Sequence, residues 1–125
     1  MHILVVEDQD SIRRMIEALV SARGHHVVAV GSGAKAVEMA MHKTPDIVLL
    51  DLHLPGQYDG FDVCKRLRQD PATKNVPVVI ISAKDDAPTR AEAQKIGATA
   101  YYGKPFSPTA LLKEIEKFGR ATRKA

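Results

Sequence analysis

The chain has 125 residues, which is enough to form one hydrophobic core and too few to divide comfortably into two domains. Hydrophobic residues make up 45% of it and charged residues 26%, a profile that excludes a disordered chain, and its apolar runs are far too short for a membrane helix of roughly 20 residues. The formal net charge is only +3 and aromatic residues reach 5%, so direct binding to nucleic acid is not expected.

Five short apolar runs have the length and composition of strands. They cover residues 3–6, 27–30, 47–50 and 78–81, with a weaker run at 99–102. A helical period appears between the first two runs, where five apolar residues share one face of a predicted helix: Ile12, Met15, Ile16, Leu19 and Val20.

Four more helices are predicted along the chain. The second covers about residues 33–42, with an inward face formed by Ala36, Val37, Ala40 and Met41. The third covers about 61–69, with an inward face formed by Phe61, Cys64 and Leu67. The fourth covers about 88–96 and ends before Gly97, a typical C-cap residue. The fifth begins at Ser107-Pro108 and buries Leu111, Leu112, Ile115 and Phe118.

Strict alternation of strands and helices, with strands that are apolar on both faces, predicts a parallel sheet covered by helices on both sides. The fold class is therefore α/β, doubly wound. We expect one folded domain over residues 1–119, followed by a basic tail or the start of a linker over residues 120–125. The single cysteine is predicted to be an inert buried thiol, and the first residues lack a secretory pattern, so we expect a cytoplasmic protein.

Polar residues follow four of the five predicted strands, at the rim where open parallel sheets bind ligands. They are Glu7-Asp8, Asp51, Ser82 and Lys104. Two like charges about 4 Å apart repel by roughly 4 kcal/mol at an effective dielectric of about 20, so clustered carboxylates require a cation. Hard oxygen ligands favour Mg²⁺, with Mn²⁺ as a substitute, while Lys104 and Ser82 suit the oxygens of a phosphoryl group.

Four motifs in this order resemble those of a response-regulator receiver domain of two-component signalling. They are the acidic pair Glu7-Asp8, Asp51-Leu52-His53-Leu54-Pro55-Gly56, Ser82-Ala83 and Lys104-Pro105-Phe106. The resemblance covers nearly the whole chain. It implies a five-stranded sheet of order 2-1-3-4-5 with five helices, and a regulatory phosphoacceptor that promotes only its own phosphorylation and dephosphorylation.

The resemblance assigns a role to each residue of the predicted site. Asp51 accepts a phosphoryl group from a histidine kinase, a phosphotransfer protein or a small donor. Glu7, Asp8, Asp51 and the backbone carbonyl of His53 hold Mg²⁺. Lys104 and Ser82 contact the phosphoryl oxygens, and the side chains of His53 and Lys84 influence its lifetime.

The resemblance also implies a conformational switch at Tyr101. This side chain moves inward when Ser82 moves toward the phosphoryl group, which changes the face of the fourth helix, fifth strand and fifth helix. A downstream protein or output domain reads that face, and phosphorylation can lead to a homodimer. A cis peptide bond is expected between Lys104 and Pro105.

Two other interpretations remain open. The segment from Pro55 to Gly60 is one residue longer than the family's usual spacing, which leaves a pseudo-receiver that never takes phosphate as an alternative. Gly31-Ser32-Gly33-Ala34-Lys35-Ala36 follows a strand and fits a dinucleotide fingerprint, although the chain lacks room for the second nucleotide-binding half. A tight turn from strand to helix is the preferred interpretation of these glycines.

Overall fold

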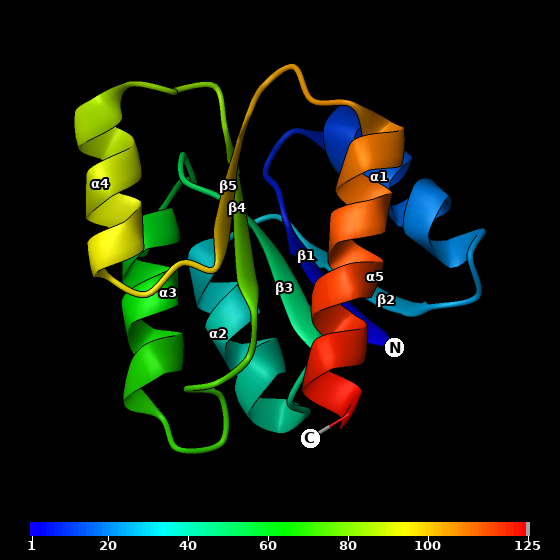
Figure 1. The fold of residues 1–125 in the computed structure, drawn as a ribbon. Helices are drawn as coiled ribbons and strands as arrows, with labels where there is room; N and C mark the ends of the chain where they lie inside the picture. The colour runs from blue at the N-terminus through cyan, green and yellow to red at the C-terminus, as the bar shows by residue number, and fades with distance from the viewer. Residues whose placement is uncertain (125) are drawn as a thin grey trace.

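A computed structural model describes residues 1–124 of the chain and, among these, the side chains of residues 1–118. Five parallel strands form one sheet in the order β2-β1-β3-β4-β5, which confirms the predicted fold class (Figure 1). The strands are β1 (His2–Val6), β2 (His26–Val30), β3 (Ile47–Asp51), β4 (Val78–Ser82) and β5 (Ala100–Gly103).

Five helices alternate with the strands and cover both faces of the sheet (Figure 1). They are α1 (Asp10–Ser21), α2 (Gly33–His42), α3 (Gly60–Gln69), α4 (Ala87–Lys95) and α5 (Pro108–Lys124). Helices α1 and α5 cover one face, and α2, α3 and α4 cover the other. None of the helices in the described part of the chain combines the length and apolar character needed to cross a bilayer.

The sheet separates two hydrophobic clusters because alternate residues of each strand point to opposite faces. Leu4 and Val6 of β1 belong to the cluster beneath α2, α3 and α4, whereas Ile3 and Val5 belong to the cluster beneath α1 and α5. All residues of β3 and β4 are buried, as expected for central strands of a parallel sheet.

Side-chain caps fix where several helices begin. The Ser32 hydroxyl accepts a hydrogen bond from the Lys35 amide at 3.2 Å before α2, and Ser107 accepts one from Ala110 at 3.3 Å at the start of α5. Asp59 forms a capping box at the start of α3. Helix α4 is followed by Gly97, whose φ of +100° is the left-handed conformation predicted for this glycine.

Two side chains predicted to face inward are exposed. Met15 of α1 is 43% exposed and Met41 of α2 is 42% exposed, so these two predictions were wrong. Each lies at the border of its helix's apolar stripe, beyond the arc that the sheet covers, whereas Ile16 and Val20 of α1 are buried. In α3, Val63 is buried although the sequence pattern did not single it out.

Helix α5 continues without interruption to Lys124, across the boundary predicted between residues 119 and 120. Leu111, Leu112 and Ile115 of this helix are buried as predicted, and Phe118 packs against the same cluster. The side chains of the predicted basic tail lie outside the described residues, so the domain boundary stays a prediction.

Arg68 of α3 ties together two loops at the rim where β4 and β5 begin. Its guanidinium donates to the Gly97 carbonyl at 2.8 and 3.0 Å, to Val76 at 2.7 Å and to Lys74 at 3.1 Å. These charge-assisted bonds satisfy carbonyl groups that no strand partner reaches and join α3 to the loops before β4 and β5.

Candidate functional site

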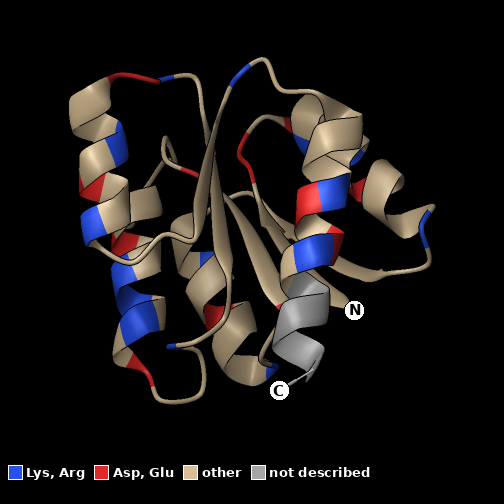
Figure 2. Cartoon of the chain, in the orientation of Figure 1, with Lys and Arg blue, Asp and Glu red and all other residues tan. Residues whose placement is uncertain are grey.

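The predicted site residues gather at the rim where the strands end. Strand register aligns Val6 with both Val30 and Leu50, and Asp51 with Ile81, so the segments that follow these strands leave the sheet together. The Lys104 amide donates to the Ser82 carbonyl at 2.8 Å, which extends the pairing of β4 and β5 to the lysine. Figure 2 shows acidic and basic segments in the loops along this upper rim.

Three carboxylates form a cluster at this rim. Ligand oxygens of Glu7, Asp8 and Asp51 all lie within 4.8 Å of one another. Glu7 and Asp51 are only 2% and 4% exposed, whereas Asp8 is exposed to solvent. Buried carboxylates are costly without a counter-charge, so this cluster is built to hold positive charge.

Lys104 supplies part of that charge. Its Nζ atom lies 2.7 Å from Glu7 Oε1 and 3.4 Å from Asp51 Oδ2. Burial lowers the pKa of Lys104, but the hydrogen bond with Glu7 and the charges of Asp51 and Glu7 outweigh burial and raise the pKa above its ordinary value. Three carboxylates and one ammonium leave a formal charge of −2, which one divalent cation would neutralise.

Backbone amides fix the orientation of the two buried carboxylates. The His53 amide donates to Asp51 Oδ1 at 3.1 Å, and the Gln9 amide donates to Glu7 Oε2 at 3.1 Å. The cluster opens into a pocket lined by Asp8, Gln9, Asp51, His53, Ala83 and Lys104. Carboxylate oxygens beside open space for water match the preferences of Mg²⁺ and Mn²⁺, so these residues fit the predicted ion.

Ser82 lies beside this pocket but is fully buried and does not line it. Its hydroxyl accepts a hydrogen bond from the Lys84 amide at 3.1 Å. Tyr101 on the neighbouring strand donates its hydroxyl to the Lys84 carbonyl. Burial raises the pKa of Tyr101, and a hydrogen bond with Ser82 opposes that rise. The backbone of Lys84 thus connects the two residues of the predicted switch, while its own side chain is exposed.

Two arginines that were not among the predicted site residues contact these segments. The Arg13 guanidinium donates to the Glu7 carbonyl at 3.0 Å, and the Arg90 guanidinium lies 4.8 Å from the centre of the Tyr101 ring and pairs with Asp85. The position of Arg13, one turn into the first predicted helix and after the acidic pair, was the available signal. For Arg90 the sequence holds no comparable signal, because the contact joins a helix to a later strand.

Within the longer loop from Pro55 to Gly60, Tyr58 lies against the start of α2. A Cβ atom at Gly33 would lie 2.4 Å from the Tyr58 carbonyl oxygen and 2.8 Å from the Tyr58 Cβ. Gly33 therefore allows the Tyr58 backbone to approach the start of α2. The peptide bond between Lys104 and Pro105 is cis, as predicted.

Comparison with known proteins gives a consistent result. The family model for the response regulator receiver domain matches residues 3–116. The response regulator PleD of Caulobacter vibrioides is 37% identical over 118 residues, which is 94% of this chain and 26% of PleD. The chain spans about half, or less, of the length of the curated relatives it matches.

Solved structures agree in fold over almost their whole length. The BeF3-activated N-terminal receiver domain of RstA from Klebsiella pneumoniae has a TM-score of 0.88 and 30% identity, with 96% of this chain and 99% of that chain covered. The receiver domain of the sensor histidine kinase PA1611 from Pseudomonas aeruginosa has a TM-score of 0.86 and 28% identity, covering 94% and 96%. That receiver domain holds a magnesium ion in its active site cleft.

Proposed function

The chain belongs to the response regulator receiver domain family, and we propose that it takes a phosphoryl group onto Asp51 in a reaction supported by Mg²⁺. The observation that carries this proposal is the carboxylate cluster of Glu7, Asp8 and Asp51, in which Lys104 bridges Glu7 and Asp51 and Asp8 is open to solvent. We place the domain in the cytoplasm, as a regulatory phosphoacceptor.

The transfer exchanges one phosphorus bond for another. A carboxylate oxygen of Asp51 attacks the phosphorus of a phosphohistidine, the phosphorus–nitrogen bond breaks, and the imidazole nitrogen keeps the electron pair. The product is an acyl phosphate on Asp51, which water later hydrolyses to inorganic phosphate. When bound, Mg²⁺ supplies positive charge that offsets the repulsion between phosphoryl and carboxylate oxygens. Glu7, Asp8, Asp51 and the carbonyl of His53 would hold it.

Lys104 and Ser82 are proposed to bind the phosphoryl oxygens. Lys104 already lies 3.4 Å from Asp51 Oδ2, so a phosphoryl group there would be within reach of its ammonium. We propose that the exposed side chains of His53 and Lys84 affect how readily water reaches the acyl phosphate.

The proposed switch connects Ser82 to Tyr101 through one backbone segment. The Lys84 amide donates to Ser82, and the Lys84 carbonyl accepts from Tyr101. A shift of Ser82 toward the phosphoryl group would therefore displace the carbonyl that binds the Tyr101 hydroxyl. Tyr101 packs against the core on one side and carries Arg90 of α4 on its ring. A change at Tyr101 would therefore alter the face of α4, β5 and α5, where we propose that an output protein, an output domain or a second copy binds.

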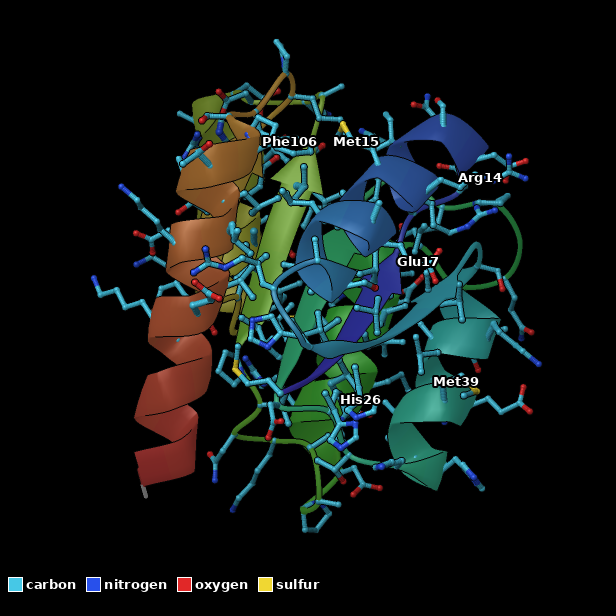
Figure 3. All side chains as sticks on the ribbon, turned by 90° about the vertical axis from the view of Figure 1, so that its right-hand side faces the viewer. Arg14, Met15, Glu17, His26, Met39 and Phe106 are labelled. Carbon is cyan, nitrogen blue, oxygen red and sulfur yellow. The ribbon has the colours of Figure 1, made fainter. Side chains whose placement is uncertain are left out.

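The phosphohistidine donor must reach Asp51 from the surrounding surface. Apolar side chains of α1, of the loop before α5 and of the first residue of α5 line a hollow beside Lys104, formed by Ile12, Met15, Pro105, Phe106 and Pro108. Figure 3 shows Met15 and Phe106 close together on this side of the molecule, and Met15 is 43% exposed. An exposed apolar patch next to a reactive group is typical of a protein-binding surface, and we propose that the kinase or phosphotransfer protein docks here.

The test is intact-mass measurement after incubation with acetyl phosphate and MgCl₂. The parent protein should gain the mass of one phosphoryl group, and the gain should disappear with Asp51→Asn or with EDTA. A modified Asp51→Asn protein would refute the assignment of the acceptor. A parent protein that stays unmodified, together with equal indifference of the parent and Asp8→Ala to Mg²⁺, would instead favour the pseudo-receiver.

A further inference from the structure

Arg13 of α1 reaches back over the segment that carries two of the proposed metal ligands. Its Nη1 atom donates to the Glu7 carbonyl at 3.0 Å and to the Asp8 carbonyl at 3.4 Å. Its Nη2 atom pairs with Asp10 in the first turn of the helix. One guanidinium therefore binds two successive carbonyls and one carboxylate at the end of β1.

A small set of contacts holds the backbone around Asp8. Gln9, the residue before α1, makes no side-chain cap, whereas the residues before α2, α3 and α4 all cap their helices. The Glu7 amide is held by the Val30 carbonyl at 3.0 Å. The peptide group between Asp8 and Gln9 is held at both ends: the Gln9 amide donates to Glu7 Oε2 at 3.1 Å, and Arg13 donates to the Asp8 carbonyl at 3.4 Å.

Arg13 also contacts the neighbouring strand end. A Cβ atom at Gly31 would lie 3.2 Å from Arg13 Nη1, so the glycine directly after β2 leaves the space in which the guanidinium lies. With only 22% of its side chain exposed, Arg13 is packed between the segments that follow β1 and β2. The forked geometry of a guanidinium suits such simultaneous contacts, which a lysine ammonium would not reproduce.

We propose that Arg13 is a positioning residue for the metal site, which acts by fixing the peptide groups of Glu7 and Asp8 and thereby the direction of their carboxylates. This inference rests on the proposed function, because it assumes that these carboxylates hold Mg²⁺. Residues that orient metal ligands typically change metal affinity by about 10- to 100-fold when they are replaced.

A purely structural role for Arg13 makes a different prediction. If Arg13 only stabilised the first turn of α1 through Asp10, then Asp10→Asn would reproduce the effect of removing Arg13. In the ion pair between Arg13 and Asp10, the Asp10 side chain is 70% exposed. Asp10→Asn leaves both carbonyl contacts in place, so the two roles can be separated.

The experiment compares Arg13→Met with Arg14→Met in the full chain by calorimetric titration with MgCl₂. Arg14 is the next residue, exposed on the same helix, and its replacement removes the same charge (Figure 3). We expect Arg13→Met to weaken Mg²⁺ binding by about tenfold. Arg14→Met and Asp10→Asn should stay within about twofold of the parent, since neither removes a carbonyl contact.

A second readout separates positioning from damage to the fold. Phosphorylation of Arg13→Met by acetyl phosphate should approach the parent rate at saturating MgCl₂, because the reacting groups are intact and only the metal requirement is higher. Arg13→Lys, which retains the charge, should also bind Mg²⁺ more weakly than the parent and serves as the readout if Arg13→Met does not fold. Parent-like Mg²⁺ affinity in the folded variant would overturn the inference. Absence of Mg²⁺ binding by the parent would instead overturn the proposed function.

Discussion

Gly60, the first residue of α3, lies directly against the backbone of Asp51. A Cβ atom at Gly60 would lie 2.4 Å from the Asp51 carbonyl oxygen and 2.5 Å from the Leu52 Cα. The Gly60 amide donates to the Leu52 carbonyl at 3.0 Å. The start of α3 thus packs against the backbone of the proposed phosphoacceptor.

We expect Gly60→Ala to lower the free energy of unfolding by about 1–3 kcal/mol, because the methyl group overlaps backbone atoms that cannot move independently. The displacement of Asp51 should also slow phosphorylation by acetyl phosphate. Urea unfolding and intact-mass time courses measure the two effects. Gly24→Ala is the control, since Gly24 has a φ of +85° and open space around it. This control should lose stability and keep the parent's phosphorylation rate.

Replacing Lys104 by methionine leaves the buried carboxylates of Glu7 and Asp51 without their ammonium partner. We expect the free energy of unfolding to fall by about 3 kcal/mol in the absence of metal, because breaking a buried ion pair leaves uncompensated charge. MgCl₂ should recover part of this loss, while phosphorylation by acetyl phosphate should fall. Urea unfolding with and without MgCl₂ is the measurement. Lys65→Met, on the exposed face of α3, is the control and should change neither the stability nor the phosphorylation rate. An equal loss of stability in both variants would contradict the role of Lys104.

The stability of the chain should depend on pH through Glu116 of α5. Hydrogen bonds from His25 and Arg23 hold the pKa of Glu116 below its ordinary value of 4.5. A carboxyl group with a lowered pKa in the folded state stabilises the fold above its unfolded pKa, and this contribution disappears as the pH falls through the folded value.

The corresponding variant is Glu116→Gln, compared with the parent by urea unfolding from pH 3 to pH 7. We expect the variant to be less stable at pH 7 by about 0.5 kcal/mol, because the group lies near the surface, and the difference should vanish toward pH 3. Glu38→Gln, which removes an exposed partner of Lys35, is the control and should show almost no pH-dependent difference. A constant difference across this range would contradict the titration of Glu116.

Cys64 should be unreactive in the folded protein. Burial raises the pKa of its thiol, its relative exposure is 0%, and its sulfur faces the Ile96 carbonyl at 3.8 Å. We expect labelling by iodoacetamide at pH 8 to be slower by about 100-fold or more than in 8 M urea, since reaction requires exposure of the thiolate. Rapid labelling of the folded protein, measured by intact mass, would contradict the buried position.

Local patterns in the sequence accounted for most of the fold. The bounds of α2 agreed with the predicted range of 33–42, because a serine cap and a glycine begin the helix and its apolar period is regular. The exposure of Met15 and Met41 could not be predicted in the same way. An apolar stripe defines which face of a helix turns inward, but the width of the sheet beneath it decides which border residues are covered.

The gathering of the candidate site residues at one rim could be predicted, because parallel strands end on the same side of a sheet. The approach of Tyr58 to Gly33 and the contact of Arg13 with the carbonyls after β1 depend instead on backbone positions that meet only in the folded chain. Every residue carries a main-chain carbonyl, so no sequence pattern shows which carbonyl a side chain will bind. The same reason explains why the four contacts of Arg68 were not foreseen.

The hydrogen bonds of Arg68 affect which end of the sheet can move. It holds the loops before β4 and β5 through bonds to neutral carbonyls, which neither a metal ion nor a phosphoryl group would replace. The opposite rim also contains contacts between ions, such as that of Lys104 with Glu7, whose partners would be exchanged during the reaction. Displacements that follow phosphorylation should therefore fade along β4 and β5 toward a fixed pivot at Arg68.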